Sequence, residues 1–219
     1  MTARIALIHA TRAAIPPIEL AFYEIWPEAE YWNLLDEGLN QILEGAGELT
    51  EEIHERFVRL ATYAADTRID GLLFTCTAFG AAMEECQKRF VFPTLKPNEA
   101  MFEIGIESGP HIGLLATHPV TLSMLEAQLE LLAQNRGLDI TIETQLAPGA
   151  WEALTNGNQK THDNIVIDTA HLLGACDVIL LAQFSMAHLA QTIQCALISK
   201  VVSSPGAAVR KLRKLLNCS

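Results

Sequence analysis

The chain has 219 residues, half of them hydrophobic, and a formal net charge of -11. This length and apolar content can bury one large core or the cores of two smaller lobes. The acidic balance offers no basic surface, so neither nucleic acid nor an anionic membrane is expected as a partner. An anionic small substrate stays open, because a few local donors can outweigh a diffuse negative surface.

Short apolar runs alternate with longer amphipathic segments in the first half of the chain. We predict strands at residues 4–10, 71–76 and 92–96. Helices are predicted at 49–66, with Thr50 as N-cap, and at 78–90. The first of these helices places its apolar side chains on one face: Ile53, Phe57, Leu60 and Ala61.

The second half continues the alternation. Strands are predicted at 111–117, 138–144, 177–183 and 200–204. Helices are predicted from about residue 121 to 134, at 161–175, and from residue 205 to the end. Strands that alternate with helices predict an α/β fold with mainly parallel sheets.

The order of these segments also repeats. RIALIHAT pairs with HIGLLATH, DGLLFTCTAFG with DVILLAQFSMA, and FPTLKPNEAMFEIG with KVVSSPGAAVRKL. The repeat predicts two similar, pseudo-twofold lobes, 1–108 and 109–204, joined near 108–110. The final helix, 205–219, could pack back on the first lobe. Because ligands bind at the carboxyl ends of parallel strands, we expect the site in the cleft between the lobes.

Cys76 stands at the end of one predicted strand and leads into a helix. The N–H groups and dipole of a helix N-terminus favour a thiolate and bind carboxylates. A lone cysteine in such a place is more often a packing residue, since free cysteine is among the most buried residue types. The repeat adds weight to a functional role, because it places Cys76 opposite an equivalent loop that carries Gln183.

The remaining cysteines are interpreted as structural, with Cys86 as a partly covered surface residue. They are Cys86, Cys176, Cys195 and Cys218. An odd number of cysteines without a CxxC pair is typical of a cytosolic protein with reduced thiols. Asp70 and Asp177 precede equivalent strands and are interpreted as structural caps.

Several common functions lack their motifs in this sequence. It has no HExxH or Cys/His ligand spacing, no GxGxxG after the first strand, no P-loop lysine and no GxSxG elbow. No metal or cofactor is therefore predicted. The chain also has no signal-peptide pattern and no apolar run of membrane-spanning length, so a cytoplasmic location is expected. Base rates for oligomers favour a homodimer.

Four segments together resemble the aspartate/glutamate racemase superfamily: LLFTCTAFG, GLLATHPVT, DVILLAQFSMAHL and VVSSPGAAV. That group includes amino-acid and hydantoin racemases, maleate isomerase and arylmalonate decarboxylase, and the resemblance covers nearly the whole chain. It implies an enzyme without metal or organic cofactor. One cysteine from each lobe would lie on either side of the substrate α-carbon, because inversion needs an acid and a base on opposite faces.

The resemblance assigns Cys76 as the catalytic thiol of the first lobe. It also implies a set of substrate-binding residues: Thr11, Thr77, Ala78 through its N–H, Thr117, His118, Gln183, Phe184 and Ser185. The sequence departs from the pattern at Gln183, which stands where the second cysteine is expected and exchanges no proton near neutral pH. We expect Gln183 to face Cys76 across the cleft at about 6–8 Å.

Three functions remain open. The first is a racemase or isomerase acting at the α-carbon of a small carboxylic acid, with Cys76 as one base and His118, His9 or His188 as the other. The second is an arylmalonate-type decarboxylase with Cys76 as its single proton donor. The third is a non-catalytic protein that binds small carboxylates. Cys76 could also act as a nucleophile, as the cysteine of maleate isomerase is thought to do.

Overall fold

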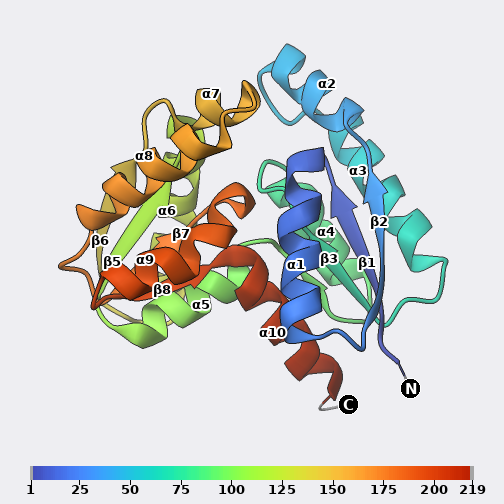
Figure 1. Cartoon of the computed structure of the whole chain (residues 1–219). Helices are drawn as coiled ribbons and strands as arrows, with labels where there is room; N and C mark the ends of the chain where they lie inside the picture. The colour runs from blue at the N-terminus through green and yellow to red at the C-terminus, as the bar shows by residue number, and fades with distance from the viewer. Residues whose placement is uncertain (1, 218–219) are drawn as a thin grey trace. The chain divides into compact units, whose positions relative to one another are not determined.

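Two four-stranded parallel sheets form the framework of the chain (Figure 1). The computed structural model describes residues 2–217 and divides into two compact units. The first unit holds the described residues up to Glu99 and those from Ala208 onward, and the second unit holds Ala100–Ala207. The predicted join lay at 108–110, whereas Ala100, Met101 and Phe102 already pack in a core of the second unit.

The sheets share one strand order, β2-β1-β3-β4 in the first unit and β6-β5-β7-β8 in the second. The first sheet consists of β1 Arg4–His9, β2 Glu30–Leu35, β3 Gly71–Phe74 and β4 Thr94–Leu95. The second consists of β5 His111–Ala116, β6 Thr141–Leu146, β7 Val178–Leu181 and β8 Lys200–Ser203. All neighbouring strands are parallel. The predicted α/β fold with two similar lobes is confirmed.

Helices connect the strands in both units. The first half of the chain forms α1 Ile15–Ile25, α2 Gly38–Ala46, α3 Glu51–Ala65, α4 Gly80–Arg89 and the 3-10 turn η1 Arg12–Ala14. The second half forms α5 Glu99–Ser108, α6 Pro119–Asn135, α7 Ala150–Thr155, α8 Gln159–His171, η2 Phe184–Leu189, α9 Ala190–Ala196 and α10 Ser204–Asn217. None of the helices in residues 2–217 has the length and apolar character needed to cross a bilayer.

The core of the first unit is built on α3. Thr50 caps this helix by accepting the Ile53 N–H at 3.4 Å, as predicted. Phe57 is 1% exposed, and its ring lies 5.0 Å from that of Phe74 and 4.9 Å from that of Phe79. These aromatic contacts join α3 to the end of β3 and to the start of α4.

The two units repeat in detail as well as in order. The Asp70 carboxylate accepts the Arg4 N–H at 2.8 Å, and the Asp177 carboxylate accepts the His111 N–H at 2.9 Å. Asp70 therefore accepts a hydrogen bond from the first residue of β1, and Asp177 from the first residue of β5. This confirms their role as structural caps. Along β1, β3 and the loops that follow them, adding 107 to a first-unit number gives its second-unit counterpart, so Arg4 and Asp70 correspond to His111 and Asp177. The same shift takes Cys76 to Gln183.

Because Gly109 has no side chain, the Asp177 carboxylate can lie directly beside its backbone. A Cβ on Gly109 would lie 2.5 Å from Cβ and Cγ of Asp177, and that carboxylate is already fixed by its bond to His111. We expect Gly109→Ala to lower the free energy of unfolding by about 1–3 kcal/mol, measured by urea denaturation. Gly45→Ala is the control, since nothing lies within 4 Å of its Cβ position in exposed α2; it should stabilise by about 0.5–1 kcal/mol. A neutral Gly109→Ala would contradict the steric argument.

Candidate functional site

Each sheet has one place where its chain connections diverge. After β1 the chain adds β2 on one side and β3 on the other, and after β5 it adds β6 and β7 in the same way. Parallel sheets bind ligands at the carboxyl ends of the strands beside such a switch point. Thr11 and Cys76 follow β1 and β3, while Thr117 and Gln183 follow β5 and β7. The structure thus gathers the predicted residues of each unit at the switch point of its own sheet.

The Cys76 thiol lies half-buried between β3 and α4. Burial raises the pKa of this thiol, and the backbone N–H groups of Ala78 and Thr77, which donate to the sulfur, partly oppose that rise. The S–H is directed at Oδ1 of Asn40, 4.0 Å away. Cys76 is therefore mainly a neutral, protonated thiol near pH 7.

Asn40 is a neighbour of the thiol that sequence reasoning missed. It lies in the first turn of α2, and its Nδ2 donates to the Ala10 carbonyl at 2.8 Å, which turns its Oδ1 toward Cys76. No helix was predicted at 38–46, so nothing in the sequence placed this amide near the site. An amide at the start of a short helix after a strand end was the available signal.

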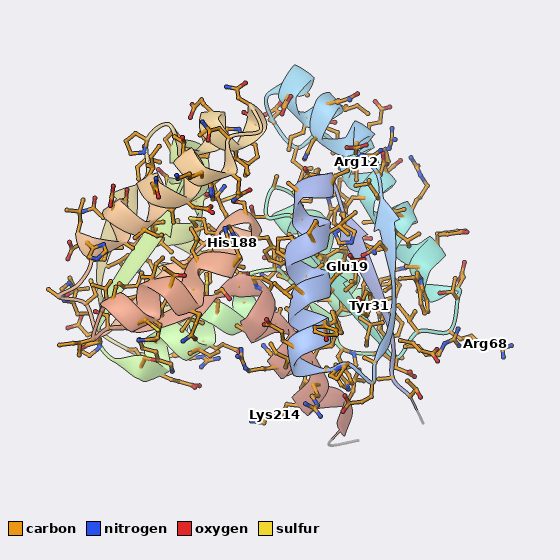
Figure 2. The ribbon with its side chains drawn as sticks, viewed as in Figure 1. Arg12, Glu19, Tyr31, Arg68, His188 and Lys214 are labelled. Carbon is orange, nitrogen blue, oxygen red and sulfur yellow. The ribbon has the colours of Figure 1, made fainter. Side chains whose placement is uncertain are left out.

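His9 is a buried residue behind the Cys76 loop, at the centre of a hydrogen-bond chain that runs from buried Thr75 out to exposed Asn33. Its Nδ1 lies 2.7 Å from Thr75 Oγ1 and its Nε2 lies 2.9 Å from Asn33 Oδ1. Asn33 Nδ2 donates to Glu19 of α1 at 2.7 Å (Figure 2 labels Glu19). The Asn33 oxygen therefore faces His9, and Nε2 of His9 carries the proton. Burial lowers the pKa of His9, which keeps the ring neutral and lets Nδ1 accept from Thr75. Both ring nitrogens are thereby engaged, and Nδ1 holds Thr75, the residue before Cys76.

His188 is similarly engaged in the second unit. Its Nε2 lies 2.9 Å from Oδ1 of Asp163, which also bonds Nδ1 of His162 at 2.8 Å and Nε2 of Gln159 at 2.7 Å (Figure 2 labels His188). Burial opposes ionisation of Asp163, but the bonds from His162, Gln159 and His188 outweigh it and lower the pKa of this carboxyl. The cluster ties η2, which follows Gln183, to α8.

The Gln183 side chain is fixed by Thr117. Its Oε1 accepts the Thr117 N–H at 2.5 Å and the Thr117 hydroxyl at 2.9 Å. A backbone N–H can only donate, so the atom facing it is the carboxamide oxygen and the NH2 group points away. No described residue of the second unit accepts from that NH2 group. Where a thiol was expected, the loop offers two N–H donors instead.

The other predicted residues complete the two sets. In the first unit, Thr11 caps η1 by accepting the Ala13 N–H at 3.4 Å. In the second unit, His118 is exposed at the start of α6 and makes no side-chain capping bond. Phe184 is buried, and the Ser185 hydroxyl oxygen is buried without a hydrogen-bond partner among residues 2–217. The first-unit residues include a thiol that can donate and accept a proton. Among the second-unit residues only His118 could do so, and the others could only bind and orient a ligand.

The other described cysteines differ from Cys76 in their surroundings. The prediction that Cys86 lies at the surface is wrong: it is fully buried, because its place in α4 puts it on the same core-facing side as Ala82 and Met83. Burial raises the pKa of Cys86 to about 12, and burial beside Glu143 raises that of Cys176 to about 11. Cys195 is exposed, and Cys218 lies outside the described residues.

Comparison with solved structures finds the same fold in several enzymes. Allantoin racemase from Klebsiella pneumoniae is 15% identical with a TM-score of 0.69, covering 99% of this chain and 89% of the other. An aspartate racemase homologue from Pyrococcus horikoshii OT3 is 15% identical with a TM-score of 0.71, covering 99% and 100%. A mutant of arylmalonate decarboxylase is 16% identical with a TM-score of 0.66, covering 98% and 93%. At these identities the likeness shows the fold alone.

Comparison at the level of sequence identifies the family. No curated protein matches the chain. The sequence model of the Asp/Glu/hydantoin racemase family matches residues 44–212, which include Cys76, Thr117 and Gln183. This match spans well over half of the chain and agrees with the resemblance seen in the motifs. The chain therefore belongs to the Asp/Glu/hydantoin racemase family.

Proposed function

We propose that the chain is a cofactor-independent racemase or isomerase that acts at the α-carbon of a small carboxylic acid, with Cys76 as its catalytic thiol. The observation that carries the proposal is the setting of Cys76. It is a half-buried thiol at a switch point, with the N–H groups of Thr77 and Ala78 turned toward its sulfur. Backbone donors in such a loop stabilise the thiolate when it forms and can stabilise charge on a substrate carboxylate.

In the proposed reaction, the Cys76 thiolate takes the α-proton and the C–H electron pair moves into the carboxylate to form an enediolate. Donors from the second unit, the Gln183 NH2 and the Thr117 loop, stabilise that charge. A second group then returns a proton to the opposite face. His118 is the candidate for this role, because it is exposed and its side chain makes no capping bond, whereas His9 and His188 are engaged in hydrogen bonds.

A second candidate function is favoured by Gln183. A carboxamide cannot supply the second proton, and the neutral Cys76 thiol is suited to donate one. In a decarboxylase, the bond between the α-carbon and one carboxyl group breaks and carbon dioxide leaves. Its electron pair forms the enediolate, and the S–H of Cys76 protonates the carbon. The product would have the opposite handedness to that made by a thiol at the second-unit position.

The experiment that tests the proposal is solvent deuterium incorporation. The panel holds allantoin, both enantiomers of aspartate and glutamate, and arylmalonates, incubated with the full chain in deuterium oxide and followed by NMR and chiral chromatography. A racemase labels remaining substrate of both hands, while a decarboxylase labels product only. The exposed-thiol variant Cys195→Ser is the control and should behave as the wild type. Binding of an acid without turnover or exchange would favour a non-catalytic carboxylate-binding protein and overturn the proposal.

The pH profile separates the two enzymatic functions further. Because burial raises the pKa of Cys76, the thiolate is scarce at neutral pH. If the thiolate is the base of a racemase, the rate of α-proton exchange without inversion, which needs Cys76 alone, should rise about tenfold per pH unit until the pH reaches that raised value. If the thiol is the acid of a decarboxylase, kcat/KM should be level near neutrality and fall above that value. A bell-shaped optimum below pH 7 would contradict both roles.

Gln183→Cys should restore a two-thiol arrangement. Position 183 is the counterpart of Cys76, and Thr117 lies beside it in the adjoining loop. We expect this variant to increase deuterium exchange into substrate of both hands by about 10²-fold or more, since a general acid or base contributes at least that factor. Gln183→Ser, which adds no comparable acid, is the matched control. Equal exchange rates in the two variants would show that position 183 does not reach the reacting carbon.

A further inference from the structure

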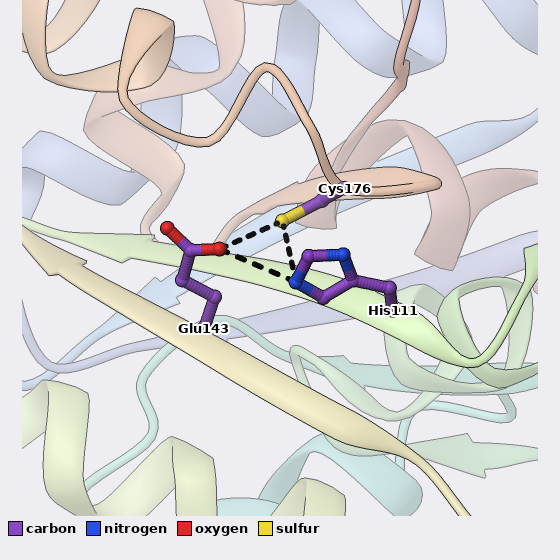
Figure 3. Close-up of side chains that lie close together, drawn as sticks. All are labelled: His111, Glu143 and Cys176. Atoms are coloured by element: carbon purple, nitrogen blue, oxygen red, sulfur yellow. Dashed lines mark hydrogen bonds and ion pairs between the residues drawn. The ribbon is translucent and has the colours of Figure 1, made fainter.

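A second cluster of reactive side chains lies at the amino-terminal ends of the strands of the second sheet, away from the switch point. His111 begins β5, Glu143 lies on β6, and Cys176 precedes β7, so all three are near the amino-terminal ends of the strands. Figure 3 shows the imidazole, the carboxylate and the thiol converging on one point. His111 and Glu143 are partly exposed and Cys176 is buried, so solvent reaches the cluster from one side.

The distances within this trio match one face of a metal tetrahedron. His111 Nε2 lies 3.2 Å from Glu143 Oε2, and Cys176 Sγ lies 3.6 Å from that nitrogen and 3.7 Å from that oxygen. Zinc bonds of about 2.3 Å to sulfur and about 2.0–2.2 Å to nitrogen and oxygen place tetrahedral ligand pairs about 3.3–3.7 Å apart. The three ligand atoms could therefore hold a zinc-class ion without rearrangement of the backbone.

Gly113 makes room for the trio. Side chains alternate along a strand, so His111 and Gly113 face the same side of the sheet, and Glu143 is the register partner of Gly113 on β6. A Cβ on Gly113 would lie 3.2 Å from the Cys176 sulfur. The thiol thus lies over bare backbone, between the two partly exposed ligands.

The fold itself does not require metal-ligating side chains at this place. The counterparts in the first unit are Arg4, which stacks 5.5 Å from the Trp32 ring, and Ile69, which is 7% exposed. Arg4 corresponds to His111 through the shared aspartate cap, and Trp32 to Glu143 through its register partner on the first strand. The same framework is therefore stable with a cation–π pair and an aliphatic side chain, so the trio is a property of the second unit alone.

We propose that His111, Glu143 and Cys176 form a binding site for a zinc-class divalent transition metal, separate from the Cys76 loop. Imidazole, carboxylate and thiolate are the donors that Zn²⁺ takes in proteins, and the exposed side leaves the fourth position to water or a solvent ligand. The bound ion would join β5, β6 and the segment before β7. Sequence spacing did not reveal the site, because its ligands are 33 and 65 residues from Cys176.

The test is a titration of the chelator-treated, reduced full chain with Co²⁺, which substitutes for Zn²⁺ and absorbs light. We expect one equivalent to bind with the intense visible bands of tetrahedral cobalt and a near-ultraviolet thiolate-to-cobalt charge-transfer band, both removed by added Zn²⁺. Cys176→Ser should lose the charge-transfer band. Glu143→Gln changes a partly exposed side chain and should fold normally while weakening Co²⁺ binding by about 10-fold or more.

Two control variants test whether the charge-transfer band comes from Cys176 and not from another thiol. Cys195→Ser and Cys76→Ser remove other thiols and should bind Co²⁺ as the wild type does, which separates this proposal from the role of Cys76. The proposal is overturned if the wild type gives no charge-transfer band at saturating Co²⁺, or if the band survives in Cys176→Ser. Either result would mean that the trio is only a hydrogen-bonded cluster.

Discussion

Cys76→Ser is expected to lower turnover of the best substrate by about 10²- to 10⁴-fold, the range for loss of a general acid or base. Serine keeps the shape of the side chain, so the loop between β3 and α4 should retain its fold. Its hydroxyl is far less acidic than a thiol and forms no useful anion near neutral pH. The loss should appear in kcat more than in KM, because the thiol is proposed to act on the reacting carbon.

The control for this variant is Cys195→Ser, which removes an exposed thiol and should leave kcat unchanged. Thermal unfolding of both variants checks that the loss is chemical. If Cys76→Ser keeps full turnover while folded, neither the racemase nor the decarboxylase role of this thiol is correct.

Phe57→Ala is expected to lower the free energy of unfolding of the first unit by about 3–5 kcal/mol, measured by urea denaturation. The ring is fully enclosed between Phe74 and Phe79, and its removal leaves a cavity that these neighbours cannot close. Phe74 ends β3 and Phe79 precedes α4, so the cavity adjoins both ends of the segment that carries Cys76. Turnover should therefore fall as well, at temperatures where the variant is still folded.

Tyr63→Ala is the matched control on the same helix. Tyr63 is 63% exposed on α3, and its removal should change the free energy of unfolding by less than about 0.5 kcal/mol. A loss below about 1 kcal/mol for Phe57→Ala would contradict the packing that supports the thiol loop.

The central strands could be predicted from the sequence because they are buried on both faces. β3 and β7 are continuous apolar runs, and β1 and β5 have polar residues only at their ends. Each predicted segment contains its strand. The repeat then showed which residues of the two units correspond, because the aspartate caps and the loops after the central strands recur at one constant spacing. This is how Gln183 was found at the position of a second thiol.

The elements that were missed lack such a pattern. β2 is an edge strand with only partly buried side chains, so EYWNLL shows neither a continuous apolar run nor strict alternation. α1 carries two prolines, which read as helix breakers but lie in the first turn, where their missing N–H groups cost nothing. Without β2 and α2, Asn33 and Asn40 could not be placed beside His9 and Cys76.

The positions of the candidate residues at strand ends could be predicted better than their contacts. Cys76, Thr117 and Gln183 could be located because loops at strand ends are fixed by topology. The Gln183–Thr117 bonds and the trio at the amino-terminal edge depend on side chains that meet only after the strands pair. Long-range pairing of this kind leaves no local spacing in the sequence.

The most direct test of the central claim is a crystal structure of the chain with a bound small carboxylic acid, such as a dicarboxylate or an arylacetate. Our account predicts that the carboxylate contacts the Thr77–Ala78 N–H groups, with Cys76 Sγ within about 3–3.5 Å of the α-carbon. It also predicts that the Gln183 NH2 contacts the same ligand. An acid bound elsewhere, with Cys76 enclosed by protein and away from the ligand, would contradict it.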